Sequence, residues 1–138
     1  MATAESLTGG RLAALLTAVP GASATFLGGV VAYATDLKIS VLGVPDEVVV
    51  THGVVSAECA LAMALGVRRL TGATYAVATT GVAGPTGQEG KPPGTVFVSL
   101  VGPATETVIG LELSGNRATV IDRTCQEALR AMLAFLED

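Results

Sequence analysis

The sequence lacks several features that mark common classes of protein. It has no tryptophan, only 4% aromatic residues and a single histidine among 138 residues. No apolar run approaches the roughly 18 residues that a membrane-spanning helix needs, and no basic segment followed by an apolar one stands at the N-terminus. These absences predict a soluble cytoplasmic protein that has no membrane partner.

Positive charge is also scarce. Lys and Arg together number 8 against 12 Asp and Glu, which gives a formal net charge of −4. The largest basic cluster is the pair Arg68 and Arg69. Because surfaces that bind nucleic acid concentrate Lys and Arg, the composition argues against a nucleic-acid partner.

Cysteine and histidine are too few and too scattered to suggest a metal centre. Cys59 and Cys125 both fall in predicted helices and lack the spacing of metal ligands. We therefore interpret them as small buried apolar residues, and we expect no disulfide, metal or cofactor. His52, the single histidine, lies in a predicted connecting segment, where a lone histidine is usually a bystander.

Small and aliphatic residues are abundant instead. Half of the residues are hydrophobic and 17 are glycine, a composition typical of α/β domains whose strands are buried on both faces. The length fits one domain, residues 1–138. Hydrophobic patterning predicts a short first strand at 1–4, further strands at 26–33 (buried), 75–80, 95–101 and 107–113, and helices at 10–17, 35–42, 56–70 and 116–137, with another short helix or turn from 45. The last two strands form a predicted antiparallel hairpin.

The segment 4–10, with the sequence AESLTGG, predicts a tight turn between the first strand and the first helix. Such a turn exposes the hydroxyls of Ser6 and Thr8, while Gly9 and Gly10 allow close approach of a ligand to the backbone. The N–H groups at a helix start attract anions, phosphate above all. The alternative is that Ser6 or Thr8 only caps the helix.

Three reactive side chains fall where a predicted strand gives way to a helix: Ser6, Tyr33 and Lys38. A nucleophilic serine needs a base, and a desolvated lysine is the natural candidate in a chain whose only histidine is doubtful. For that role, Lys38 has to be neutral, so its pKa has to be lowered by burial or by a neighbouring cation. Lys38 also lies in the first turn of its helix, where a cation is unfavourable unless it has another partner.

Two further places point to a ligand. The turn-rich segment 81–94 follows a predicted central strand, at the sheet edge where open α/β sheets bind their ligands. Arg117 falls in the first turn of the last helix, where a cation again calls for an anionic partner.

Five motifs, which together span nearly the whole chain, resemble the CinA C-terminal domain family. This family includes competence-damage inducible proteins. The motifs are 4–10 (AESLTGG), 28–33 (GGVVAY) with Lys38, 52–56 (HGVVS), 80–85 (TGVAGP) and 91–96 (KPPGTV). The resemblance implies a three-layer α/β/α sandwich around a mixed, mostly parallel five-stranded sheet. It also implies hydrolysis of the carboxamide of nicotinamide mononucleotide to nicotinic acid mononucleotide and ammonia, a reaction of pyridine nucleotide and NAD metabolism.

The resemblance also assigns roles to residues. Ser6 corresponds to the nucleophile, Lys38 to its base, and Tyr33 to a residue that assists proton transfer. Arg117 corresponds to a ligand of the substrate phosphate. The remaining residues implied to bind substrate are Thr8, Gly9 and Gly10 on one wall and Thr80, Gly81, Ala83, Gly84 and Pro85 on the other.

The chain departs from the family pattern in three places. Leu7 stands where the family commonly has cysteine, and Asn116 replaces an aspartate before Arg117. A helix and a complete first strand that usually precede the Ala-Glu-Ser stretch are expected to be truncated here.

Two other functions are compatible with the sequence. One is a binding module that holds a nucleotide phosphate at Gly9 and Gly10 without turnover, and the other is an amidohydrolase that acts on a different small amide. We also expect self-association into a homo-oligomer through an apolar helix face, because the domain is small and low in aromatic residues.

Overall fold

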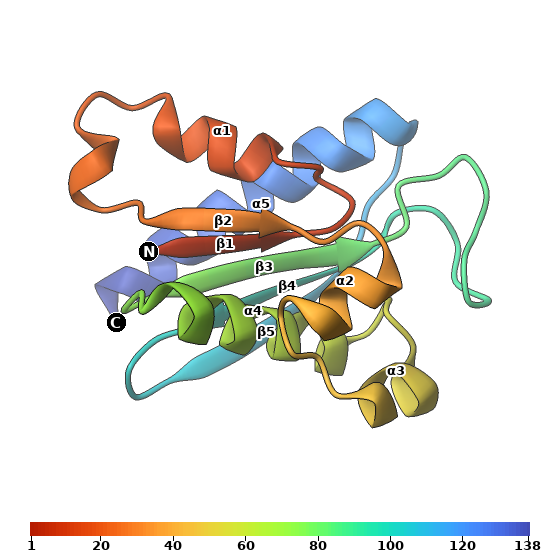
Figure 1. Cartoon of the computed structure of the whole chain (residues 1–138). Helices are drawn as coiled ribbons and strands as arrows, with labels where there is room; N and C mark the ends of the chain where they lie inside the picture. Colours follow the sequence, from red (N-terminus) through yellow and green to blue (C-terminus); the bar gives the residue numbers. More distant parts are fainter.

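The computed structural model describes all residues 1–138. Strands and helices alternate along the first two-thirds of the chain, and a hairpin and one long helix complete it (Figure 1). The elements are β1 (Ala2–Glu5), α1 (Arg11–Thr17), a 3-10 turn η1 (Ala22–Ala24), β2 (Gly28–Val31), α2 (Thr35–Ser40), α3 (Asp46–His52), α4 (Ala57–Thr71), β3 (Ala76–Gly81), β4 (Thr95–Val101), β5 (Glu106–Glu112) and α5 (Arg117–Glu137).

The five strands form one mixed sheet in the order β2-β1-β3-β4-β5. β1 pairs in parallel with β2 and β3, whereas β4 is antiparallel to both β3 and β5. Four strands therefore run in one direction and β4 alone runs against them. This arrangement confirms the mixed, mostly parallel sheet and the predicted hairpin of β4 and β5.

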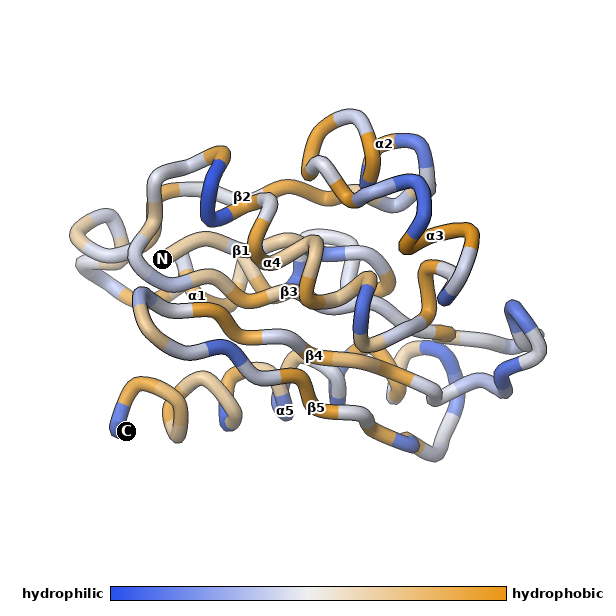
Figure 2. Tube along the Cα trace, turned by 90° about the horizontal axis from the view of Figure 1, so that it is seen from below, coloured by the Kyte–Doolittle hydropathy of each residue, from blue (hydrophilic) through white to orange (hydrophobic).

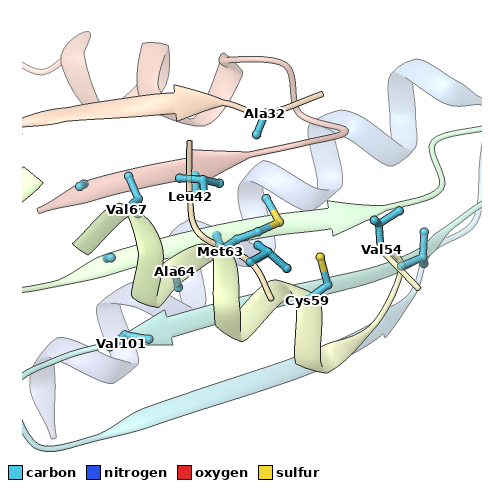
Figure 3. Close-up of a cluster of buried hydrophobic side chains, with 14 of the residues drawn as sticks. Ala32, Leu42, Val54, Cys59, Met63, Ala64, Val67 and Val101 are labelled. Carbon is cyan, nitrogen blue, oxygen red and sulfur yellow. The ribbon is translucent and has the colours of Figure 1, made fainter. Parts of the chain in front are cut away.

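Helices cover both faces of the sheet, which makes the three-layer sandwich (Figure 1). α4 packs on one face through Met63, Ala64 and Val67, which Figure 3 shows in one cluster with Val101 of β4. On the other face, Val120, Cys125 and other residues of α5 pack with β3 and β4. Both cysteines are buried and free, as predicted.

Polar side chains fix the starts of the two long helices. The Ser56 hydroxyl accepts a hydrogen bond of 3.1 Å from the Cys59 N–H at the start of α4. Asn116 accepts one of 3.0 Å from the Thr119 N–H at the start of α5. α4 ends at Gly72, whose φ of 71° favours glycine. The predicted bounds of both helices are confirmed within one residue.

The second strand differs from its prediction. It covers only Gly28–Val31 rather than 26–33, and it is not buried on both faces, because it is the edge strand of the sheet and pairs only with β1. Val31 is 46% exposed and Leu27, just before the strand, is 60% exposed. The apolar run of this segment indicated a strand correctly but could not reveal that one side has no neighbour.

The topology brings together the segments that the sequence analysis selected. β1, β2 and β3 are parallel, so their carboxyl ends lie at one edge of the sheet, while both chain termini lie toward the opposite edge (Figure 1). The loop after β3 extends beyond that first edge and carries hydrophilic residues (Figure 2). None of the helices has the length and apolar character required to cross a bilayer.

The paired glycines of β2 provide a test of this packing. Gly29 lies opposite Thr3 of β1, and a Cβ atom at position 29 would stand 2.2 Å from the Thr3 hydroxyl oxygen and 3.0 Å from its carbonyl oxygen. A Cβ at Gly28 would meet nothing within 4 Å. We predict that Gly29→Ala lowers the free energy of unfolding by about 1–3 kcal/mol, the usual cost of overpacking. Gly28→Ala should change it by less than about 1 kcal/mol.

Urea unfolding of the two variants beside the wild type measures both values. Equal effects of the two substitutions would contradict the close approach of β1 to Gly29.

Candidate active site

A cavity of about 260 Å³ opens at the carboxyl ends of β1, β2 and β3. Its lining comes from segments that are far apart in the sequence. These are the turn after β1, the β2–α2 connection with α2, the α3–α4 connection, the end of β3 with the loop after it, and the start of α5. The lining side chains that carry chemistry are Ser6, Tyr33, Thr35, Lys38, Thr80, Thr86, Gln88 and Arg117.

The centre of this cavity is a contact between Ser6 and Lys38. Lys38 is only 1% exposed, and its Nζ atom lies 2.9 Å from the Ser6 hydroxyl oxygen. Nζ also donates to the backbone carbonyl oxygens of Ala32 at 2.7 Å and Tyr33 at 3.3 Å. The segment directly after β2 therefore supplies two acceptors to the amino group, and the turn after β1 supplies the third contact.

Burial lowers the pKa of Lys38 from its ordinary value of 10.5, because desolvation disfavours the charged form. The opposing influences of Cys59 and Glu89, which raise the pKa, are smaller. A neutral lysine has two N–H bonds and one lone pair. When the amino group is neutral and Ala32 and Tyr33 accept its two N–H groups, its lone pair is left for the Ser6 hydroxyl to donate to. This is the geometry of a base beside a nucleophile.

Cys59 is the other potential nucleophile near Lys38, but its environment keeps it protonated. The side chain is fully buried in α4, and burial is the main reason that its pKa rises to about 11. A thiol with this pKa holds almost no thiolate at neutral pH. Of the two side chains, only Ser6 both lines the cavity and contacts the Lys38 amino group.

The predicted anion site at the start of α1 is occupied by the protein itself. The Glu5 carboxylate, 1% exposed, accepts hydrogen bonds from the N–H groups of Leu12 at 2.9 Å and Ala13 at 3.1 Å. The Thr8 hydroxyl donates to Glu5 at 2.6 Å and lies 2.8 Å from the Thr79 hydroxyl. The N-terminal N–H groups of α1 therefore hold an internal carboxylate.

Three residues that the sequence predicted to line the substrate site lie outside the cavity lining. These residues are Thr8, Gly9 and Gly10. Thr8 is fully buried, and the Gly9 N–H donates to the Ser6 carbonyl oxygen at 3.1 Å. Gly9 and Gly10 instead have φ values of 57° and 100°, which shape the turn that holds Ser6.

The opposite wall agrees better with expectation. Thr80, Gly81, Ala83 and Gly84 line the cavity, whereas Pro85 does not. The Thr80 hydroxyl donates to the Val54 carbonyl oxygen at 2.7 Å, which joins β3 to the α3–α4 connection. The backbone N–H groups of Leu7, Ala83 and Gly84 donate no hydrogen bond within the chain, so they are available to a ligand.

Arg117 and Tyr33 meet at the cavity. The Arg117 guanidinium donates to the Tyr33 hydroxyl at 2.8 Å and to the Gly84 carbonyl oxygen at 2.7 Å. Both side chains are exposed, and both line the cavity. The cation at the start of α5 thus lies on the side of the cavity where Tyr33 and the loop after β3 come together.

Sequence reasoning did not select several residues that shape this site. Glu5 appeared only as part of a motif. The contacts of Glu89 and Lys91 with the α3–α4 connection could not be predicted, because no periodic pattern in the sequence marks them. His52 lies outside the cavity lining, and its Nδ1 atom is 3.6 Å from Glu58. No group of three or more His, Cys, Asp or Glu side chains is placed to hold a metal ion.

The fold and the site define a three-layer α/β domain with a buried serine–lysine pair at the carboxyl edge of its sheet. The model of the CinA C-terminal domain matches residues 1–136, and the chain belongs to this family. A CinA-like protein of Frankia casuarinae is 50% identical over 139 residues, which cover 99% of this chain and 32% of that protein. A CinA-like protein of Thermotoga neapolitana is 43% identical, with coverage of 100% and 34%.

Solved structures agree with this assignment. The crystal structure of competence damage-inducible protein A from Klebsiella pneumoniae superposes with a TM-score of 0.96 at 36% identity, covering 99% of this chain and 85% of that one. A competence/damage inducible protein from Agrobacterium tumefaciens gives a TM-score of 0.93 at 37% identity, with coverage of 96% and 82%. The chain spans about a third of the length of the curated relatives that it matches.

The lowered pKa of Lys38 predicts a particular dependence of stability on pH. Below the folded-state pKa, both states are protonated and the cost of burying the charge is fully present. Between that pKa and about 10.5, the unfolded state binds more protons, so the free energy of unfolding rises with pH. We predict that Lys38→Met lacks this rise.

Urea titrations between neutral pH and about pH 11 measure the slope in the wild type and in the variant. Identical slopes in the two proteins would show that Lys38 titrates as it does in water.

Proposed function

We propose that this domain hydrolyses the carboxamide of nicotinamide mononucleotide to nicotinic acid mononucleotide and ammonia. The observation that carries the proposal is the 2.9 Å contact between the Ser6 hydroxyl and the Nζ atom of buried Lys38 inside the cavity. Membership of the CinA C-terminal domain family supports the proposal at a coarser level. The chemistry also fits, because a serine with a neighbouring lysine base can carry out acyl transfer from an amide.

The chemistry proceeds in two halves. Ser6 Oγ attacks the carboxamide carbon and its proton passes to neutral Lys38. The tetrahedral intermediate then expels ammonia, which receives that proton from Lys38, and leaves an ester between Ser6 and the nicotinoyl group. Water next attacks the ester, again with Lys38 as base, and the proton returns to Ser6 as the acid product leaves. Lys38 is neutral at the start of each half.

Backbone N–H groups are suited to stabilise the developing oxyanion. The Leu7 N–H directly follows the nucleophile in the chain, and those of Ala83 and Gly84 stand on the opposite wall. All three lack a partner within the chain. Donors fixed in this way before the reaction stabilise charge without reorganisation. Tyr33, held by Arg117, is the family's candidate for assisting proton transfer.

The substrate phosphate is proposed to bind at Arg117 rather than at the start of α1. The N–H groups at that helix start are engaged by Glu5, so an entering phosphate would have to displace a buried carboxylate. Arg117 is exposed at the cavity and carries a fixed positive charge.

Self-association and a cytoplasmic location stay predictions.

The first test is ammonia release from nicotinamide mononucleotide by the purified chain. We predict that Ser6→Ala and Lys38→Met each lower kcat by a factor of about 1,000 or more, because each removes half of the nucleophile–base pair. Ser40→Ala, which alters an exposed serine of α2, is the matched control and should keep full activity. In the wild type, kcat should rise with pH until Lys38 is deprotonated.

The outcomes separate the three functions. Turnover of other small amides, without turnover of the mononucleotide, would show that the domain is an amidohydrolase with a different substrate. Binding of the mononucleotide without ammonia release would indicate a binding module. A Lys38→Met variant with near-normal kcat would remove the lysine from the mechanism.

A second test concerns Arg117. We predict that Arg117→Met raises KM for nicotinamide mononucleotide by about 10- to 100-fold, the cost of one lost charge-assisted hydrogen bond. The riboside, which has no phosphate, should bind wild type and variant about equally. If the variant lost both substrates alike, Arg117 would be supporting the cavity wall through Tyr33 and Gly84 rather than binding phosphate.

A further inference from the structure

The loop after β3 contains a small hairpin with an unusual residue at its tip. Gln88 and Lys91 pair through both backbone hydrogen bonds, at 3.0 and 2.9 Å. The two residues between them, Glu89 and Gly90, both have positive φ, 53° and 74°. This matches a type I′ turn, whose first central position is usually Asn, Asp or Gly. Glu89 is the only non-glycine residue of the chain with positive φ. A contact of the Glu89 side chain is therefore expected to compensate for this unfavourable backbone conformation.

The Glu89 carboxylate makes such a contact with the α3–α4 connection. Its two oxygens accept hydrogen bonds from the backbone N–H groups of Val54 at 3.0 Å and Val55 at 2.9 Å. Lys91 of the same hairpin donates to the Val55 carbonyl oxygen at 2.5 Å and lies 3.9 Å from Glu89. The hairpin is thus fixed to the α3–α4 connection by both of its charged side chains.

The α3–α4 connection is shaped to receive this carboxylate. A Cβ atom at Gly53 would stand 2.6 Å from both carboxylate oxygens of Glu89, and the φ of Gly53 is 77°. Only glycine therefore leaves room for the carboxylate at this point. Val54 and Val55 line the cavity on one side of this contact, and Gly87 and Gln88 line it on the other.

We propose that Glu89 is a positioning residue of the active site, which fixes the hairpin wall of the cavity against the α3–α4 wall. This inference rests on the proposed function for its kinetic consequences. Its structural part, the fixing of the two walls against each other, stands without it.

The charged and titratable groups around Lys38 determine what removal of Glu89 does. They are Cys59 from α4, Glu89 from the hairpin, and Tyr33 and Arg117 across the cavity. Cys59 is held as a neutral thiol by its raised pKa, so Glu89 is the anion of this set. The Glu89 charge raises the pKa of Lys38 and offsets part of the effect of burial. Its neutralisation should therefore lower the pKa of Lys38 further.

The experiment compares three variants of the full chain. Glu89→Gln keeps the shape but removes the charge, and its amide nitrogen cannot accept the second N–H bond. Glu89→Asp keeps the charge but is one methylene too short to reach both N–H groups. Glu47→Gln, at an exposed acid of α3, is the matched control. The pKa of Lys38 is measured by NMR on the lysine ε-carbon, and kcat and KM are measured against pH.

For Glu89→Gln we expect a lower pKa of Lys38, a shift of the rising limb of kcat to lower pH, and a fall in kcat/KM of roughly tenfold at high pH. Glu89→Asp should lose a similar factor while the pKa of Lys38 stays close to that of the wild type. Glu47→Gln should change neither quantity. Amide exchange at Val54 and Val55 should accelerate in both Glu89 variants only.

Unchanged amide exchange together with unchanged kcat/KM in folded Glu89→Gln would overturn the inference. A lowered pKa of Lys38 in that variant would add support, because it would show that the charge of Glu89 acts on the amino group. Failure of the proposed function is distinguishable from failure of the inference. In that case no variant releases ammonia, yet the NMR and exchange differences persist.

Discussion

The burial of a lysine amino group is the constraint on which the site depends. Lys38 is almost fully buried and needs acceptors, which it finds in two carbonyl groups directly after β2 and in the Ser6 hydroxyl. A buried cation is costly, so burial favours the neutral form of the amino group, while the acceptors satisfy its N–H groups. The positions of α2, the segment after β2 and the turn after β1 are thereby fixed relative to one another, and the amino group lies against the Ser6 hydroxyl.

A second buried ionisable side chain stabilises the other side of the Ser6 turn. Glu5 directly precedes Ser6, and its carboxylate joins the turn to the start of α1 and, through Thr8, to Thr79 of β3. The serine is therefore held from both sides by groups that are themselves immobilised. This rigidity is what a nucleophile needs, since an error of an ångström in its position lowers the rate strongly. Glu5 also leaves no free N–H group at Leu12 or Ala13, at the start of α1, for an external anion.

Much of this arrangement could be predicted from the sequence, and the remainder has a physical explanation. Strand-to-helix junctions indicated Ser6, Tyr33 and Lys38, because parallel strands place their carboxyl ends together. Local patterns could not show that β2 is an edge strand, since exposure of one side depends on the order of strands. They also could not show that Glu5 fills the start of α1 or that Glu89 reaches Val54, because both contacts depend on side-chain geometry in three dimensions.

The central place of β1 in the sheet has a consequence for how the molecule reaches its active form. β1 lies between β2 and β3, and its pairing with β3 joins residues more than 70 positions apart, as Ala2 with Ala76. Such long-range parallel pairing forms slowly, because the entropy of loop closure is lost before the contacts are gained. During synthesis the Ser6 turn is made before β3 and α5, so it acquires its complete surroundings only when the start of α5 arrives. The turn therefore exists without its finished cavity while most of residues 1–138 are translated.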